Sequence, residues 1–341
     1  MNLSTKKLFH LIQSLLVVGA LVLFFYPLGE RFISSISTGL FVKPYLSLNL
    51  PEPKDLSGFP SASAVPILMY HGVVRHPDGV NTSRRLFIKQ METLKKEGFE
   101  TIALSELDDF LKGKFVLPPR PIIITFDDGR RDSFYPVDAI FRRLGFRGAI
   151  FIATIKANEK DPFYLSWREI NKAKNTGRFE IEAHGRRSHE KVIADTYGNH
   201  GRFLVARIFG DNGLESVEDY KRRVEEDYVN GVIDIKRNLG FIPRYFAVPF
   251  SDFGLHQGIS NVEIAVVFNR ELVKKYFRLA FYEVSTYEDS GWPLETFYNF
   301  KDTDPYHLRR LEVKEMGAES LLRALEEFRP RPGGTTNQND S

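Results

Sequence analysis

Two carboxylates and two imidazoles stand where they could share one site. Asp127 and Asp128 directly follow an apolar run, and His184 and His189 flank a short loop that begins after a predicted strand. Two adjacent buried carboxylates repel each other unless a cation or a proton resolves the conflict. Two imidazoles and one carboxylate leave a ligand position open, which is typical of catalytic zinc. Each residue alone fits a turn or a surface histidine, but together the four predict a metal-assisted hydrolytic site.

The composition excludes several other kinds of site and partner. The 341 residues include no cysteine, which excludes a thiol nucleophile, a cysteine-ligated metal and a disulfide-stapled scaffold. The 47 basic and 44 acidic side chains give a net charge of +3. Most of this excess comes from Lys6 and Lys7, so the remainder has no net field that would attract a nucleic acid.

The elements that must position these residues alternate between strands and helices. Buried strands are predicted at residues 65–70, 99–102, 121–126, 148–152, 179–183, 245–248 and 264–268. Helices are predicted between them, and the longest spans 217–239. Residues 193–215 show no clear period and are predicted to be an inserted loop. This alternation predicts an α/β fold, either a closed parallel barrel or a doubly wound sheet, with its chemistry at the C-terminal ends of the strands.

The N-terminal part predicts attachment to a membrane. Residues 8–28 are mostly apolar and as a helix would span about 30 Å, the thickness of a bilayer core. Lys6 and Lys7 precede them, so the positive-inside rule leaves the N-terminus in the cytoplasm and places the rest outside it. The length favours an anchor over a cleaved signal peptide. We therefore predict a single-pass anchor at 1–28, a stalk at 29–64, a periplasmic or extracellular domain at 65–328 and a disordered tail at 329–341.

The residues around the candidate site resemble those of the polysaccharide deacetylases, the NodB-homology or carbohydrate esterase family 4 enzymes. Thr125 to Gly129 resembles the first motif of the family, and the two histidines fall where the family has its metal-binding pair. Their wide spacing resembles that of the biofilm poly-N-acetylglucosamine deacetylases. Further matches lie at Val65 to His71, Gly98 to Ile102, Trp167 and Phe246 to Phe250. The resemblance extends from Pro66 to Val313.

This resemblance implies a fold, an activity and a set of roles. The fold is a distorted (β/α) TIM-like barrel of about seven strands. The activity is metal-dependent removal of N-acetyl groups from an N-acetylglucosamine-containing polysaccharide, by attack of a metal-bound water. Asp127 would be the general base, and the backbone of Phe250 an oxyanion donor. Asp128, His184 and His189 would bind a divalent metal, with Zn²⁺ expected and Co²⁺ or Ni²⁺ as alternatives.

The remaining assignments are less direct. His307 is the candidate general acid, and His256 is the other spare imidazole. Where the family often has an Arg that pairs with the base, this chain has Ala247, so we expect a nearby Arg to hold Asp127 instead. Two alternatives stay open: a polysaccharide O-acetyl esterase with the same site, and a non-catalytic carbohydrate-binding or assembly module. The residues predicted to contact the sugar are Tyr70, His71, Pro249 and Trp292.

Overall fold

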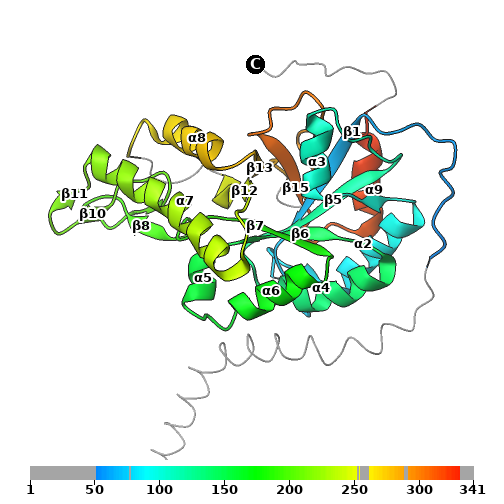
Figure 1. Cartoon of the computed structure of the whole chain (residues 1–341), viewed down its shortest axis with the longest axis horizontal. Coiled ribbons are helices and arrows are strands. Elements are labelled where there is room, and N and C mark those ends of the chain that lie inside the picture. Colours follow the sequence, from blue (N-terminus) through cyan, green and yellow to red (C-terminus); the bar gives the residue numbers. More distant parts are fainter. Residues whose placement is uncertain (1–50, 77, 252, 254–260, 288–290, 331–341) are drawn as a thin grey trace, which may run out of the picture. The chain divides into compact units, whose positions relative to one another are not determined.

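The computed structural model describes residues 51–330 except 77, 252, 254–260 and 288–290. Within them, seven strands close into a ring in which every strand is parallel to its neighbours (Figure 1). In order around the ring they are β1 (Ala64–Tyr70), β15 (Leu308–Glu312), β13 (Leu279–Glu283), β12 (Tyr245–Ala247), β7 (Phe179–Ala183), β6 (Gly148–Ile152) and β5 (Pro121–Phe126). The ring confirms the predicted α/β barrel of about seven strands.

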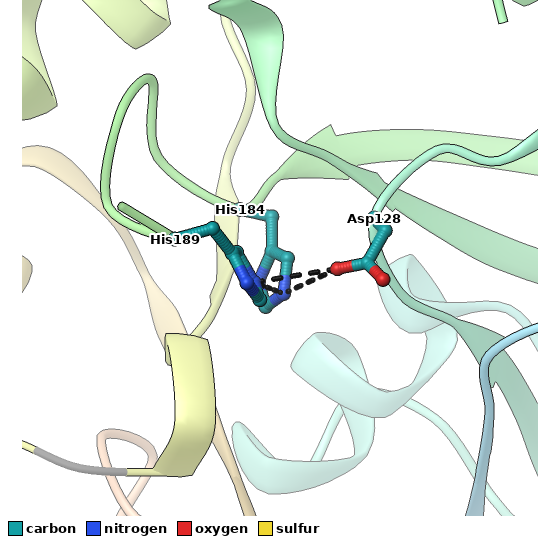
Figure 2. Close-up of side chains that lie close together, drawn as sticks. All are labelled: Asp128, His184 and His189. Atoms are coloured by element: carbon teal, nitrogen blue, oxygen red, sulfur yellow. Dashed lines mark hydrogen bonds and ion pairs between the residues drawn. The ribbon is translucent and has the colours of Figure 1, made fainter. Parts of the chain in front are cut away.

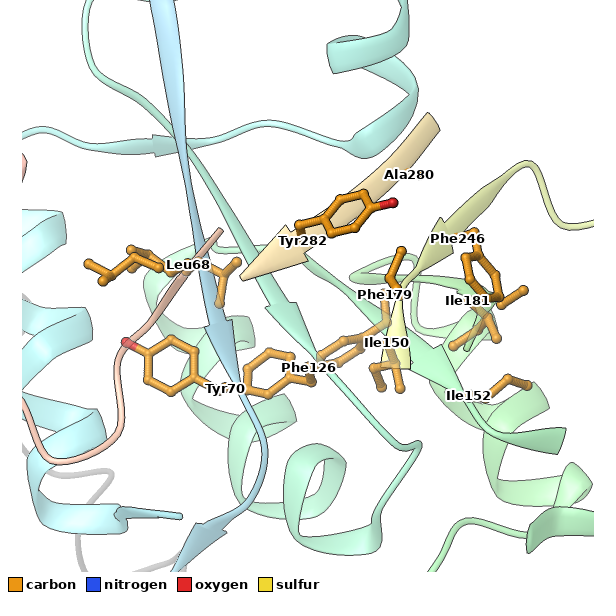
Figure 3. Close-up of a cluster of buried hydrophobic side chains, with 14 of the residues drawn as sticks. Leu68, Tyr70, Phe126, Ile150, Ile152, Phe179, Ile181, Phe246, Ala280 and Tyr282 are labelled. Atoms are coloured by element: carbon orange, nitrogen blue, oxygen red, sulfur yellow. The ribbon is translucent and has the colours of Figure 1, made fainter. Parts of the chain in front are cut away.

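Side chains of the ring strands alternate between two hydrophobic clusters, as the two-residue period of a strand requires. In β1, Val65 and Ile67 belong to one cluster, and Leu68 and Tyr70 to the other. The first cluster draws on every ring strand except β7, so it fills the barrel interior. The second, part of which Figure 3 shows, faces outward against helices.

Helices cover the outer face of the barrel, and one of them closes an end. They are α2 (Arg84–Lys96), α3 (Leu104–Leu111), α4 (Arg131–Leu144), α5 (Thr154–Asn158), α6 (Trp167–Asn175), α7 (Val217–Leu239), α8 (Ala265–Tyr276) and α9 (Ala318–Glu327). Helix α3 differs from the rest because Leu104, Leu107 and Phe110 join the interior cluster. Glu180 of β7 accepts hydrogen bonds from Leu104 N (2.5 Å) and Ser105 Oγ (3.0 Å), so α3 closes the N-terminal end of the barrel.

The seam between β7 and β12 is the thinnest in the ring. A single register pair joins them, Phe246 with Ala183. The inward carboxylate of Glu182 compensates: its Oε2 accepts hydrogen bonds from Arg244 N (2.7 Å) and Tyr245 N (3.0 Å). Burial outweighs these two bonds and raises the pKa of Glu182 to about 8.

Several elements differ from the sequence-based expectation. The predicted strand at 264–268 is the beginning of α8, where buried residues recur at helical spacing (Ala265, Asn269, Leu272 and Val273). A short apolar run does not by itself distinguish these two structures. The predicted strand at 99–102 contains β4 (Glu100–Thr101), which pairs with β5 outside the ring. Strands β13 and β15 complete the ring and were not predicted, and β14 (Tyr298–Phe300) pairs antiparallel with β1.

The predicted loop at 193–215 carries ordered structure. Strands β8 (Lys191–Ile193) and β9 (His200–Arg202) form one hairpin, and β10 (Phe209–Gly210) and β11 (Gly213–Leu214) form another. Arg223 of α7 holds the segment between them by donating to Phe203 O (2.9 Å) and Ala206 O (2.8 Å). The insertion is therefore fastened to α7. A short parallel pair, β2 (Val73–Val74) with β3 (Thr82–Ser83), follows β1.

The two ends of the chain were predicted to be an anchor with a stalk and a disordered tail. The predicted anchor and residues 331–341 of the predicted tail lie outside the described residues. No helix of the described residues combines the length and the apolar character needed to cross a bilayer. Part of the predicted stalk, residues 51–63, is described. There Lys54 N donates to Lys96 O (2.8 Å) and Ala62 N to Pro118 O (3.3 Å), so this part lies against the barrel domain.

Candidate active site and metal centre

The three predicted metal ligands converge at the C-terminal end of the barrel (Figure 2). Asp128 comes after β5, and His184 directly after β7. His184 Nε2 and His189 Nε2 lie 2.7 Å apart, and Asp128 Oδ1 lies 3.6 Å from the first and 3.3 Å from the second. The structure thus brings together three side chains whose ligand atoms all lie within 4.8 Å of one another.

A turn with unusual backbone angles separates the two carboxylates. Asp127 N still donates to Tyr70 O (3.0 Å), so Asp127 extends the ladder of β5 and faces the barrel interior. Asp128 has φ +72° and Gly129 φ +70°, both in the left-handed region that few L-residues adopt. A side chain at Gly129 would collide with Ile152 Cγ2, 2.8 Å from an ideal Cβ. The turn therefore directs Asp128 toward the histidines and leaves Asp127 in line with its strand.

The histidines present their Nε2 atoms to the same point. His184 Nδ1 lies 2.8 Å from the carbonyl oxygen of Ala247, which fixes the tautomer in which Nδ1 carries the proton and Nε2 has a free lone pair. Burial and the neighbouring His184 lower the pKa of His189 to about 4. Both rings are thus suited to bind a cation as neutral ligands, and a backbone carbonyl orients one of them.

The loop between the histidines is held from α7. Asp227 accepts hydrogen bonds from Arg186 N (3.0 Å), Arg187 N (2.6 Å) and Ser188 Oγ (2.5 Å). Gly185, with φ +78°, starts the loop because a side chain there would overlap Ser188 Oγ. A single buried carboxylate therefore fixes the wide histidine spacing that the sequence showed.

Asp127 is paired with an arginine of β15, which is separated from β5 by β1 alone. Arg310 of β15 donates from Nη1 to Asp127 Oδ1 (2.7 Å) and from Nη2 to Oδ2 (2.8 Å). Arg310 is 1% exposed and Asp127 3%. Burial alone would raise the pKa of Asp127, but the guanidinium outweighs it and holds that pKa well below its usual range. The expected arginine exists, although it is distant in sequence and not nearby.

His71 belongs to a second charged group at the same end of the barrel. Tyr70 of β1 pairs with Phe126 of β5, so the next residues, His71 and Asp127, stand at the same height on adjacent strands. His71 Nδ1 forms an ion pair with Glu312 Oε1 (3.1 Å). Burial alone would lower the pKa of His71, but Glu312 and the two aspartates outweigh it and raise that pKa to about 9.

Glu312 is the centre of this group. Its Oε2 lies 2.6 Å from Lys314 Nζ. Burial would raise the pKa of Glu312, but contact with His71 lowers it to about 2. Burial and the charge of Glu312 raise the pKa of Glu283 to about 8, so Glu283 is protonated at neutral pH. Sequence reasoning missed Glu283, Arg310 and Glu312; for the last two, the charged residues between the leucines of β15 were the available signal.

The other predicted site residues have different surroundings. Tyr70 is a core residue and cannot contact a sugar, because its ring is 1% exposed, packs on Phe126 and donates from its hydroxyl to Gln90 (3.1 Å). His307 precedes β15 and stacks on Tyr282 (4.5 Å). Its assignment as general acid stays a prediction; it stands at the N-terminal end of β15, about 10 Å along the strand from Arg310.

Pro249 and Trp292 were predicted to contact the sugar, and His256 was the other spare imidazole. Pro249 and Phe250 lie in the short helix η2 (Pro249–Ser251), where the Phe250 ring lies 4.7 Å from that of His189. Trp292 packs near Phe328 and Arg323, at 6.4 and 5.1 Å, and its sugar contact stays a prediction. His256 lies outside the described residues.

The residues present fit a divalent cation. Asp128 Oδ1 is buried and has no hydrogen-bond partner within the described residues, although two imidazole nitrogens face it. A buried carboxylate oxygen left in this way costs free energy unless a cation satisfies it. One carboxylate and two neutral imidazoles suit Zn²⁺, Co²⁺ or Ni²⁺.

Comparisons with known proteins agree with this geometry. The model of the polysaccharide deacetylase family matches residues 116–257. A poly-β-1,6-N-acetyl-D-glucosamine N-deacetylase of Escherichia coli K12 is 19% identical over 181 residues. That match takes in 48% of this chain, which spans 27% of the length of that relative.

Solved structures show the same fold. A de-N-acetylase from Aggregatibacter actinomycetemcomitans is similar with a TM-score of 0.62 and 20% identity, over 77% of this chain and 100% of that one. The deacetylase domain of BpsB from Bordetella bronchiseptica is similar with a TM-score of 0.60 and 19% identity, over 75% of this chain and 98% of that one. At these identities the likeness extends to the fold.

Proposed function

Because the chain carries a polysaccharide deacetylase domain, we propose that it removes N-acetyl groups from an N-acetylglucosamine-containing polysaccharide. The observation that carries the proposal is the arrangement of the two aspartates. Asp128 faces two imidazole nitrogens, while Asp127 beside it is ionised and held by Arg310. A metal ligand set next to an ionised carboxylate is what hydrolysis of an amide requires.

Each residue has a proposed part in the reaction. Asp128, His184 and His189 hold the divalent metal, which when bound supplies Lewis acidity toward water and the acetyl carbonyl. Asp127 accepts a proton from the attacking water. The backbone N–H of Phe250 donates to the oxygen on which charge develops. Water adds its hydroxyl to the acetyl carbon, the bond from that carbon to nitrogen breaks, and acetate and an amine are released.

His71 replaces His307 as the proposed general acid. It stands beside Asp127 at the same strand level, whereas His307 stands at the other end of β15. Its ion pair with Glu312 stabilises the protonated imidazole, so it can give a proton to the departing amine nitrogen. The residue predicted to contact the sugar thus takes a different proposed role.

One of the two alternatives, the non-catalytic module, has lost the observations that supported it. The non-catalytic module was supported by the missing arginine partner of Asp127 and by the missing acid, and Arg310 and His71 now stand in those places. An O-acetyl esterase would need the same residues, so only the product distinguishes it. We further propose that residues 1–28 anchor the domain outside the cytoplasm, on the support of their apolar run and the preceding Lys6 and Lys7.

Amine release from defined substrates tests the proposal. Full-length protein loaded with Zn²⁺ or Co²⁺ should release acetate and free amines from N-acetylglucosamine oligomers or polymers. Asp127→Asn should keep the metal but lose turnover at least about a hundredfold, because it removes the base without removing a ligand. His184→Ala should lose the metal itself. Acetate release from O-acetylated xylan without new amines would favour the esterase, and full metal occupancy without any product would refute the proposal.

A further inference from the structure

Three side chains lie in contact beside the candidate metal ligands, and the outermost belongs to the insertion. The Phe250 ring lies 4.7 Å from that of His189. The guanidinium of Arg202, at the end of β9, lies 4.5 Å from the centre of the Phe250 ring. Arg202 Nη1 also donates to the backbone oxygen of Phe250 (3.2 Å). Arg202 therefore holds Phe250 at its ring and at its backbone, and Phe250 contacts a ligand.

The hairpin geometry explains why Arg202 reaches this place. Strand β8 begins at Lys191, two residues after His189, and Lys191 pairs with Arg202 across the hairpin. Phe203 N donates to Glu190 O (3.0 Å) and continues this pairing toward the ligand. The β8–β9 hairpin thus begins next to His189, and its last strand residue, Arg202, lies at that same end of the hairpin.

The turn that contains Phe250 needs external contacts to keep its shape. Phe250 has φ +58° and Ser251 φ +49°, so two consecutive L-residues occupy the left-handed region. Such conformations persist when surrounding contacts over-determine them. Ser251 Oγ accepts a hydrogen bond from Glu283 N (2.6 Å), and Phe250 is held by Arg202. One contact comes from the barrel and the other from the insertion.

We propose that Arg202 is a positioning residue, through which the inserted hairpin fixes Phe250 and, by way of the Phe250 ring, the orientation of His189. The inference rests on the metal site of the proposed function, and it gives the insertion a part in building that site. Groups that orient metal ligands typically change metal affinity by 10- to 100-fold when they are removed. Lysine keeps the charge of arginine but lacks the planar group that covers an aromatic face.

Metal affinity measured without substrate tests this role. Co²⁺ is titrated into full-length apoprotein, with its visible absorption reporting the ligand geometry and chelator competition giving the Kd. We expect Arg202→Ala to weaken Co²⁺ binding about tenfold and to alter the absorption band, and Arg202→Lys to recover only part of the loss. An Arg202→Ala protein with wild-type Kd and spectrum would overturn the inference.

A double-mutant cycle with Phe250→Ala shows whether Arg202 acts through that ring. If it does, Arg202→Ala should have little further effect on Co²⁺ affinity in the Phe250→Ala background, whereas additive losses would overturn the proposed route. Phe250→Leu and Arg202→Lys keep the test decisive if an alanine variant does not fold.

Arg120→Ala is the matched control. Arg120 also lies over a phenylalanine ring, 5.2 Å from the centre of Phe99, near the N-terminal ends of β4 and β5. Its removal should lower Tm but leave the Co²⁺ Kd unchanged; a similar loss of affinity would mean that Arg202 acts only through stability and would overturn the inference. A wild-type protein that binds no Co²⁺ would refute the metal site as well, whereas equal affinities would refute only the role of Arg202.

Discussion

The two halves of the barrel mouth contribute different parts of the site. The half formed by β5 and β7 supplies Asp127, Asp128 and the histidines from positions directly after the strands. The half formed by β13 and β15 supplies Glu283, Arg310 and Glu312 from within the strands, on their inward faces. The first half carries the groups that would touch metal and substrate, and the second carries the charges that set their protonation.

This difference shows that the residues proposed to react and the residues that hold them in place can come from different strands of one barrel. Side chains after a strand can turn toward a ligand, as Asp128 does through its left-handed backbone. Side chains within a strand are fixed by the pleat and by burial, so a charge there acts at a constant position. Arg310 and Glu312 are two residues apart on β15 and face the same interior, where one holds the proposed base and the other the proposed acid.

Among the substitutions considered, removal of Arg310 should have the largest effect on stability and activity. A small effect would mean that the β13–β15 half does not support the residues of the other half. Arg310→Ala leaves the Asp127 carboxylate buried and unpaired, which costs about 3–5 kcal/mol in the free energy of unfolding. Without the guanidinium, burial raises the pKa of Asp127 and favours its protonated form, which cannot accept a proton from water, so we expect deacetylation to fall about 10²- to 10³-fold while metal stays bound. Denaturant unfolding, metal analysis and initial rates measure the three quantities.

Its neighbour provides the control. Arg309 is on the same strand but is part exposed, and its nearest acidic partner is Glu295 at 3.8 Å. Arg309→Ala should therefore change the rate by less than about threefold, as surface ion pairs contribute little. Equal losses from both substitutions would mean that β15 acts through its fold and not through the Asp127 pair.

The dependence of activity on pH tests the role proposed for Glu312. A histidine acid works only while it is protonated, and the pKa of His71 is raised to about 9, so activity should be lost as pH rises through that region. Glu312→Gln removes the charge that raises this pKa, so the alkaline limb of kcat/KM should move down by at least about one pH unit. Glu283→Gln should move it less, since the groups that raise the pKa of His71 are Glu312 and the two aspartates. An unmoved alkaline limb in Glu312→Gln would exclude His71 as the group that titrates.

The smallest effect concerns the seam where the two halves meet at β7 and β12. The pKa of Glu182 is raised to about 8, so the folded protein ionises it less readily than the unfolded chain does. Its contribution to stability is therefore complete below the ordinary pKa of a glutamate and is lost as pH rises toward 8. Glu182→Gln removes this loss, and its Tm advantage over wild type should grow by a few degrees between pH 5 and pH 8. A constant difference in Tm across that range would contradict the assignment.

Sequence patterns predicted one half of the site well and the other poorly, for a reason visible in single residues. Asp128, His184 and His189 are chemically distinctive and follow strong apolar strands, so type and place together indicate a ligand set. Arg310 lies in a strand whose charges and leucines also fit an exposed helix or edge strand. His307 was the candidate acid and His71 a predicted sugar contact, because the sequence around them does not show which of the two lies beside Asp127.

The sequence by itself indicated the α/β class, the candidate metal ligands and the family resemblance, because strand periodicity and ligand chemistry are local properties of the chain. Only the tertiary structure decided which arginine holds Asp127, which histidine stands beside it and what the insertion contacts. These depend on closure of the ring, which places β15 beside β1, and on the return of the β8–β9 hairpin to His189. Such contacts join residues far apart in the chain, so they can be identified only once the fold is known.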